Sequence, residues 1–582
     1  ALAAQLSRGG EGVVRGEATE MLWGLIGGTM DGLRLAGKAF REGVPVRPGT
    51  KVEGYTRKAI SGANMGASGN LGRAIDLLGT AVRTPGRFLM ASDEFFKSIN
   101  FRMELNAQAL RQVRNEGLEG KVGAKRMADL ISDPDFLKRV KPLADEFADY
   151  QTFTKQLGDT GSAIAAFRDS HPAAKLVLPF LRTPVNIFKY VGERTPFLNR
   201  LSSQVRADLA AGGARADMAR AKVQLGGMVM ASTSVLASSG YITGRGPRDP
   251  NLRREWLETH QPYSIKIGGT WYSYNRLDPL GALLGMASDF ADIVGDLDEI
   301  DASQLGAAMA LSVSNNMLSK TYLTGLADVL EAIQSPTEDA AQALRRLGGT
   351  IVPAGVAQVA RYMDPTLREV NSITDAMIAR IPGWSSTLPA KMNLWAEPIR
   401  LQGGLGPDLA SPIYTKTPGL KPVSEEMVRQ GVSVAMPAKW IFGKRPPQGD
   451  PLAEPTAGHG VPLEPKEYEQ YVKLAAGHGL APGVPLLKDA LTRLIDSDTY
   501  KREEDGPDAG KALLLKDLIY RYRRAAHDKL IADSPELQAQ IAMKSKQRVE
   551  AIRPGSTSLP QPRSLGERPS GDVESLIRSL RP

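Results

Sequence analysis

A stretch of 22 residues without a charge, Val223–Gly244, constrains the fold of this chain more than any other segment. As a helix it would span about 33 Å, close to the roughly 30 Å of a bilayer's hydrocarbon core. Serine, threonine and glycine dilute its apolar side chains, however, whereas a constitutive membrane anchor is richer in Leu and Ile. We favour a buried helix over a permanent anchor, and a helix that is buried first and inserted later fits best. The candidate residues of this membrane-spanning or buried helix are Leu225, Met228, Val229, Met230, Val235, Leu236, Tyr241 and Ile242.

A glycine repeat marks another helix, predicted over residues 13–40. Gly24, Gly28 and Gly32 are spaced four apart, so on a helix they share one face and let a second helix backbone approach closely. The uncharged part of this helix, Met21–Met30, is too short to cross a bilayer, which favours helix packing within a protein or an assembly. Two further uncharged runs have a similar small-residue character: Ala302–Ser319 and Leu347–Ala360.

The triplet Arg-Thr-Pro occurs three times, at 83–85, 182–184 and 194–196, each time before an apolar helical stretch. Threonine can cap a helix and proline suits its first turn, so we predict a helix from Pro85 to Glu116, capped by Thr84 and ended by Gly117. Arginine is unfavourable at the positive end of a helix dipole. It either clamps a carbonyl or carboxylate of the preceding turn or forms an outward basic contact. Together with the basic end of a C-terminal helix, the candidate basic contacts are Arg83, Arg182, Arg194, Arg521, Arg523 and Arg524.

One stretch has a clear β pattern. Alternating residues on both sides of Gly268-Gly269, at 263–267 and 270–274, predict a two-residue hairpin. Thirteen prolines between residues 381 and 462 predict an irregular, extended surface connector, and helices are predicted again at 464–475, 486–496, 508–532 and 535–551. The predicted fold is mainly α: an extended multi-helical assembly with one small β-hairpin and long irregular Pro/Gly-rich connectors.

The predicted elements divide the chain into seven consecutive segments. They are an N-terminal helical region (1–170), the Arg-Thr-Pro helices with the long uncharged helix (171–245), a β-hairpin insert (246–280), a small-residue-rich helical region (281–380), the Pro-rich connector (381–462), a C-terminal helical domain (463–552) and a flexible tail with a short terminal helix (553–582). The chain begins with Ala1 and lacks a signal-peptide pattern there, so either an initiator Met was removed or the chain is part of a longer one.

Composition argues against most catalytic chemistry. The chain has no cysteine, which excludes disulfides, thiolate metal sites and a cysteine nucleophile, and its five histidines are scattered. It carries no Gly-rich phosphate loop, no His-Glu-x-x-His and no Gly-x-Ser-x-Gly motif. Two Ala-Gly-His-Gly repeats contain His459 and His478, but no third metal ligand is evident. We therefore predict that the chain is not an enzyme and has no catalytic residue, metal site or cofactor. Its net charge of +9 either indicates an anionic partner or serves only solubility.

Several strings resemble segments of the large internal virion proteins of tailed, short-tailed above all, bacteriophages and prophages. They cover about half of the chain: Thr270–Gly281 with Leu284–Ala287, Leu178–Lys189 with Glu193–Pro196, Arg83–Glu94, and the region from Glu467–Tyr471 to Tyr520–Arg523. The resemblance implies a polypeptide that is packed in the capsid near the portal, ejected before the genome, and assembled into an oligomeric DNA-translocation conduit across the host periplasm and inner membrane. Its motifs are structural, so no functional residue is transferred one by one.

The implied partners are further copies of the chain, other virion core, portal or ejection proteins, phage DNA and the host inner membrane. A disulfide-free helical chain with largely local contacts suits a protein that must unfold, pass through a tail and refold. Three alternatives stay open: a static portal or core scaffold that remains in the capsid, a structural fragment of a larger enzyme-bearing virion protein, and an unrecognised peptidoglycan hydrolase.

Overall fold

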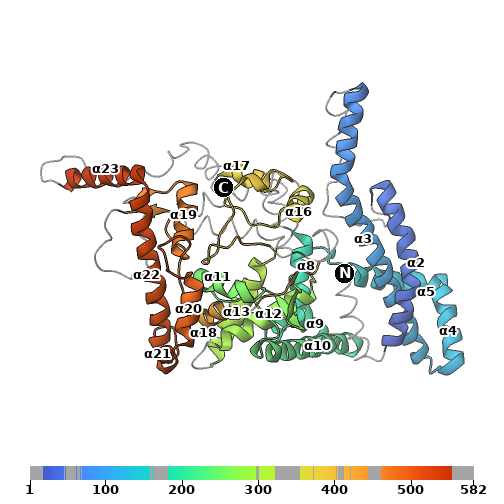
Figure 1. Ribbon diagram of the computed structural model, residues 1–582. Helices are drawn as coiled ribbons and strands as arrows, with labels where there is room; N and C mark the ends of the chain where they lie inside the picture. The colour runs from blue at the N-terminus through green and yellow to red at the C-terminus, as the bar shows by residue number, and fades with distance from the viewer. Residues whose placement is uncertain are drawn as a thin grey trace. The chain divides into compact units, whose positions relative to one another are not determined.

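The computed structural model describes residues 17–44, 46, 61, 66, 68–157, 162, 181–295, 301–320, 354–370, 372–401, 403, 412–419, 421–442 and 460–552. The chain is mainly helical, as predicted, with two small antiparallel sheets (Figure 1). It divides into two compact units, and each of them joins stretches that lie far apart in the sequence. The first unit comprises Ala1–Gly246, Gln261–Leu347 and Asp408–Thr415, and the second comprises Pro247–His260, Gly348–Pro407 and Lys416–Pro582.

The first unit begins with a pair of helices, α2 (Ala18–Glu42) and α3 (Gly69–Asn115), which lie side by side (Figure 1). The glycine repeat of α2 faces α3. A Cβ atom added to Gly24 would lie 2.8 Å from the Cα of Met103, and one added to Gly28 would lie 2.8 Å from the Cα of Ile99. The repeat therefore lets the two backbones touch, which is the close packing predicted from its spacing.

The start of α3 differs from the prediction. The helix begins at Gly69 and continues through residues 84 and 85, so Thr84 is not an N-cap; its hydroxyl donates to the Thr80 carbonyl within the helix at 2.9 Å. The predicted end is confirmed, because α3 stops at Asn115 and Gly117 follows with a positive φ of 71°. The glycines of α2 lie opposite the part of α3 from Phe95 to Met103, so the helix begins well before its contact with α2.

The remaining helices of the first unit enclose two apolar cores. One core joins α3 to the two helices that follow it, and the other joins α5 to the helices around α10. The elements are α4 (Gly120–Ser132), α5 (Pro134–Gln151), α8 (Arg182–Arg194), the 3₁₀ turn η1 (Leu198–Leu201), α9 (Ser203–Ala211), α10 (Gly213–Ser238), α12 (Leu280–Gly295) and α13 (Ala302–Leu318).

The long uncharged segment forms most of α10, but the helix ends at Ser238, six residues before the predicted stretch ends. Tyr241 and Ile242 lie beyond the helix, and Ile242 makes an antiparallel bridge to Ile265. The helix crosses α8 very closely, since a Cβ on Gly226 would lie 1.9 Å from the Arg194 carbonyl oxygen. Within the described residues, no helix combines the length and apolar character that crossing a membrane requires.

The predicted hairpin is confirmed. Strands β1 (Ser264–Ile267) and β2 (Thr270–Ser273) pair antiparallel, and Gly268 and Gly269 form the turn with φ of 56° and 80°, as a type I′ turn requires. A third strand, β3 (Thr415–Lys416), completes the sheet in the order β1-β2-β3.

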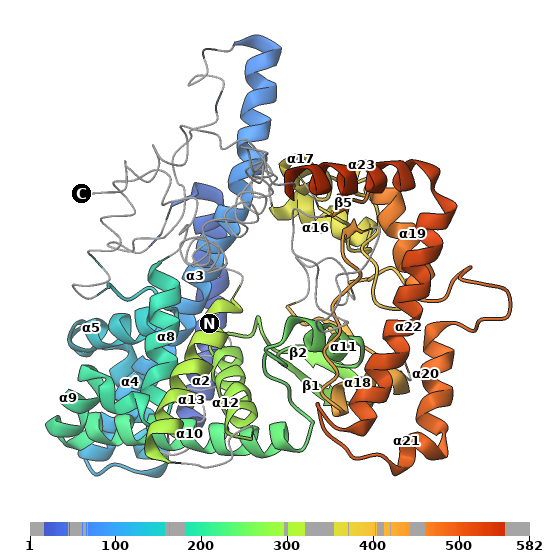
Figure 2. The same ribbon diagram turned by 90° about the vertical axis from the view of Figure 1, so that its left-hand side faces the viewer.

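The second unit contains the predicted C-terminal helices almost as expected (Figure 2): α19 (Pro465–Ala475), α20 (Leu487–Asp496), α22 (Gly510–Asp533) and α23 (Pro535–Ile552), with a short α21 (Asp498–Arg502) between them. Local stop and start signals set their bounds: Pro465 and Pro535 begin α19 and α23, and Gly510 begins α22. The unit's other elements are α11 (Pro250–Thr259), α16 (Ala354–Met363), α17 (Ile373–Ile378), η2 (Ser385–Thr387), α18 (Pro422–Arg429), β4 (Trp440–Ile441) and β5 (Val461–Pro462).

The proline-rich stretch is more than a surface connector. Its described part is largely irregular, but it contains α18, and it contributes Trp395, Met427 and Val432 to the core formed with α19, α20 and α22. Pro422 begins α18, and the apolar residues between it and Pro437 reach the core.

Candidate functional site

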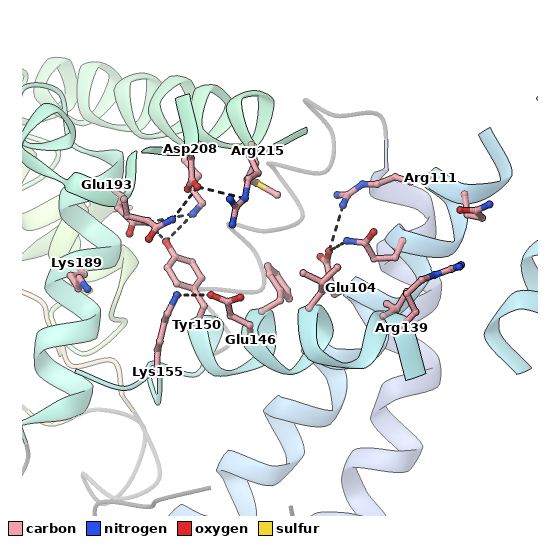
Figure 3. A pocket seen from close by; sticks show the side chains of 18 of the residues that line it. Glu104, Arg111, Arg139, Glu146, Tyr150, Lys155, Lys189, Glu193, Asp208 and Arg215 are labelled. Atoms are coloured by element: carbon pink, nitrogen blue, oxygen red, sulfur yellow. Dashed lines mark hydrogen bonds and ion pairs between the residues drawn. The ribbon is translucent and has the colours of Figure 1, made fainter. Parts of the chain in front are cut away.

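The first unit has a pocket of about 640 Å³ lined by α3, α5, α8, α9 and α10 (Figure 3). One face of α5 forms its apolar floor. Phe136, Val140, Leu143 and Phe147 follow one another at steps of three and four residues, so they lie in a row along the helix. The start of α5 is fixed by a cap: the Asp133 side chain accepts a hydrogen bond from the Asp135 N–H at 3.1 Å.

A buried cluster of charges closes the pocket where α5, α8 and α10 meet. The Tyr150 hydroxyl donates to the Glu193 carboxylate and accepts from Arg194 at 3.1 Å and from Lys222 at 3.2 Å. Lys222 also pairs with Glu193 at 3.3 Å. Burial raises the pKa of the Tyr150 hydroxyl well above its usual value, so it stays a hydrogen-bond donor at neutral pH. The cluster ties three helices together, with the Tyr150 hydroxyl and the Lys222 ammonium group both on the Glu193 carboxylate.

The rim of the pocket carries charges of both signs. Its carboxylates are paired: Glu146 with Lys155 at 2.7 Å, Asp208 with Arg215 at 4.0 Å, and Glu104 with Arg111 at 3.6 Å. An apolar floor with a mixed charged rim suits the binding of an amphipathic segment. Catalysis is disfavoured, because paired carboxylates are poor general acids or bases. Among the described residues, no group of three or more histidine and acidic side chains could hold a metal ion.

The predicted basic contacts have different surroundings. Arg194 is buried, lies 3.4 Å from the Tyr190 ring centroid and donates to the Tyr190 carbonyl at 3.0 Å, which matches a clamp and not an outward contact. Arg182 is half-buried at the start of α8, where Thr183 provides no cap. The side chain of Arg83 lies outside the described residues.

The third Arg-Thr-Pro triplet closes a helix and does not open one. The Thr195 hydroxyl donates to the Val191 carbonyl at 2.9 Å at the end of α8, and the chain turns at Phe197 with a φ of 69°. A cap at position 195 is therefore wrong for this triplet.

The basic end of α22 divides between surface and interior. Arg521 is exposed and pairs with Asp517 at 2.7 Å, and Arg524 is exposed as well. Arg523 is buried and donates to the Ala435 carbonyl. His478 is exposed in the loop after α19, and His459 lies outside the described residues.

The apolar residues of the long uncharged segment divide between the interior and the surface. Met230 and Ile242 are buried, and Leu225 and Val229 are half-buried. The others are exposed, Met228 by 70% and Val235 by 66%, together with Leu236 and Tyr241. One side of the helix packs on α8 and α12, and the other presents apolar side chains to the surroundings.

A second apolar surface was not found from the sequence. Leu22, Trp23, Ile26, Met30 and Leu33, here called the α2 outer face, are between 58% and 73% exposed. The sequence does contain the signal. Because the glycines of α2 must face α3, the large apolar residues that alternate with them have to face away.

The sequence also gave no hint of a buried polar cluster beneath the hairpin. Asp289 accepts from the Arg245 backbone N–H at 2.6 Å and from the Tyr263 hydroxyl at 3.2 Å, and burial raises its pKa to about 7. Nearby, Lys320 is 1% exposed and donates to Asp278 at 2.7 Å and to the Asn275 carbonyl at 3.0 Å. The string 270–281, which carries part of the family resemblance, therefore forms a turn whose polar groups are held by buried partners.

Comparison of this chain with protein-family models, with curated proteins and with solved structures gives no significant match.

Proposed function

We propose that this chain is an internal virion protein of a tailed bacteriophage or prophage, packed in the capsid near the portal and ejected into the host. There it would form part of an oligomeric conduit that carries DNA across the periplasm and the inner membrane. Its role is assembly and contact, without catalysis. The partners are further copies of the chain, other core, portal or ejection proteins, and phage DNA.

The observation that carries the proposal is the exposure of large apolar side chains on regular, well-packed helices. The α2 outer face and the exposed side of α10, with Met228 and Val235, belong to helices whose opposite sides are already packed. Contiguous exposed apolar side chains mark surfaces that bind a partner. A protein whose helices keep such surfaces is suited to assembly with other copies, other proteins or a membrane.

The chemistry of the pocket supports the same conclusion. Glu193 is held by Lys222 and Tyr150, and Glu146 by Lys155, so the cluster stabilises a helix arrangement more readily than it could transfer a proton. The strings that resemble internal virion proteins fall on structural parts of the fold: Arg83–Glu94 lies within α3, and Thr270–Gly281 forms β2 and the turn into α12.

The test is quantitative mass spectrometry of particles of the phage or induced prophage that encodes the chain, before and after triggered genome release. Peptides from α2 and from α22 should be present in full particles and depleted in emptied ones. Retention in emptied particles would identify a static core scaffold instead, and absence from both samples would refute a virion role. A zymogram of the purified chain on peptidoglycan should show no clearing; a cleared band would overturn the non-enzymatic assignment.

A further inference from the structure

Among the described residues, the packing of α2 within the first unit does not use the α2 outer face. The packing of α2 on α3 uses the glycine side, where Gly24, Gly28 and Gly32 approach the backbone and side chains of α3. Met21 and Ala39 are buried on that same side. The five residues of the outer face point the other way, and each keeps more than half of its surface exposed.

The charges of α2 are sorted between its sides. At about 100° per residue, Arg34 and Arg41 fall on the same side as Trp23 and Met30. Both arginines are exposed. The acidic residues lie on the flank that leads back to α3, together with the exposed Lys38. Asp31 is among these acidic residues and pairs with Arg102 of α3 at 3.1 Å. The outer side is therefore apolar over its first half and carries two positive charges, with no acid, over its second half.

This distribution selects among the partners that could cover the face. A second copy applied through the same face would meet apolar residues and arginines but no carboxylate, so Arg34 and Arg41 would lose water without gaining a counter-charge. A surface of nucleic acid would pair the arginines but leave Leu22, Ile26 and Leu33 in water. An anionic lipid surface satisfies both halves, because it accepts apolar side chains below its head groups and pairs arginine with phosphate.

We infer that the α2 outer face binds an anionic lipid surface, with α2 lying in the plane of the membrane. Leu22, Ile26 and Leu33 enter the boundary between head groups and acyl chains. Trp23 takes the interfacial position that its ring favours, and the two arginines contact lipid phosphates. The glycine contact with α3 keeps the opposite side of the helix covered. The inference rests on the proposed function only for its setting, the host inner membrane.

Flotation of the purified full-length chain with vesicles tests the inference. Vesicles of phosphatidylcholine with one third phosphatidylglycerol should carry at least ten times more protein than vesicles of phosphatidylcholine alone. The double variant Ile26→Asp/Met30→Asp should reduce flotation at least tenfold on the anionic vesicles. The variant Arg34→Glu/Arg41→Glu should remove the preference for anionic lipid. The control is Leu77→Asp, which puts one such charge at a 74% exposed position of α3 outside this face and should float like the unchanged chain.

Each contrary result has a defined meaning. Failure of the unchanged chain to float with anionic vesicles overturns the inference, and so does an equal loss in the Leu77→Asp control. If the Ile26→Asp/Met30→Asp variant floats normally but dissociates an oligomer in light scattering, a second copy is the occupant. Far-ultraviolet circular dichroism should be unchanged in all variants, because the substituted side chains are exposed. The proposed function is tested separately from the lipid contact. If the chain is absent from virions but still binds vesicles, the virion role is refuted and the lipid contact stands.

Discussion

The glycine repeat of α2 allows a sharp test, because one helix carries both constrained and unconstrained glycines. The change is Gly28→Ala. The added methyl would lie 2.8 Å from the Cα of Ile99 and 3.1 Å from the Cβ of Arg102. Carbon atoms in contact normally sit about 3.5–4.0 Å apart, so the helices would have to separate by about 1 Å. On Gly27, by contrast, a Cβ meets nothing within 4 Å.

The two substitutions should therefore have opposite effects on the free energy of unfolding of α2. Alanine in place of glycine stabilises a helix interior by about 1 kcal/mol, and Gly27→Ala should gain this in full. In Gly28→Ala the same gain is outweighed by an overpacking cost of about 1–3 kcal/mol, to which the loss of contacts along the separated helices adds. We expect Gly28→Ala to be destabilising by about 1–2 kcal/mol, and the two variants to differ by about 2–3 kcal/mol.

Hydrogen exchange followed by mass spectrometry on the full-length chain measures this locally, which matters because the chain has two units. The peptide that covers α2 should exchange faster in Gly28→Ala than in Gly27→Ala, by roughly 30- to 150-fold if exchange follows local opening. Peptides of α22 in the second unit serve as the internal control and should not change. Equal exchange of the α2 peptide in the two variants would refute the close packing of α2 on α3.

Three further predictions concern the buried polar groups of the first unit, each read from urea denaturation monitored by circular dichroism. Lys222→Met should be destabilising by about 2–4 kcal/mol, because it leaves the buried Glu193 without this cation, and adding Glu193→Gln should restore part of the loss; an unchanged midpoint in the single variant would contradict the ion pair. Asp289→Asn should abolish a pH dependence. Burial raises the folded-state pKa of Asp289 to about 7, above its unfolded value of 3.8, so its contribution to stability is full below pH 3.8 and is lost by the time the pH has risen through 7. The unchanged chain should therefore weaken relative to this variant as the pH rises from 3.8 to 7, and parallel pH profiles would count against this prediction. Lys320→Met should be destabilising by about 2–4 kcal/mol, since it leaves Asp278 buried without its cation, whereas Lys320→Arg should lose less; equal losses would contradict a role for the charge.

The parts of the fold that were predictable from the sequence are those that local chemistry decides. The hairpin needs two residues with positive φ between alternating strands, and Gly268-Gly269 supplies them. The C-terminal helices begin and end at prolines, glycines and polar residues, so their predicted bounds agree with the structure to within a residue or two: α20, for example, runs from Leu487 to Asp496. In these segments no distant contact competes with the local preference.

Local rules failed where a side chain that could cap a helix bonds backwards within one. Thr84 and Pro85 have the chemistry of a helix start, yet α3 runs through them and the Thr84 hydroxyl donates to the Thr80 carbonyl. Thr195 bonds backwards to the Val191 carbonyl and ends α8, whereas its triplet was expected to begin the stretch that follows. In both cases the threonine hydroxyl donates to the carbonyl four residues earlier in an existing helix. The sequence alone does not distinguish this bond from capping.

The buried cluster that closes the pocket was not predictable because its residues come from three separate helices. Tyr150, Glu193 and Lys222 are 29 to 72 positions apart in pairs, and no periodicity links them. An unpaired charged side chain is costly to bury. The burial of Glu193 and Lys222 is therefore explained only when these two residues and Tyr150 are placed together. A single sequence shows the charges but not which of them compensate one another.

The α2 outer face differs from the pocket, because its orientation follows from residues of one helix. An amphipathic helix is normally taken to bury its large apolar side, and by that rule Leu22, Ile26 and Leu33 would be core. The glycines reverse this expectation: three of them at a spacing of four make the smallest side of the helix the one that can lie nearest another backbone, which sends the largest side chains outward. The exposure of those side chains on α2 is the result. A glycine repeat opposite an apolar stripe therefore indicates a helix with two contacts, one made within the chain and one left for a partner. In this chain the sign of the charges beside the stripe, Arg34 and Arg41, favours an anionic surface as that partner.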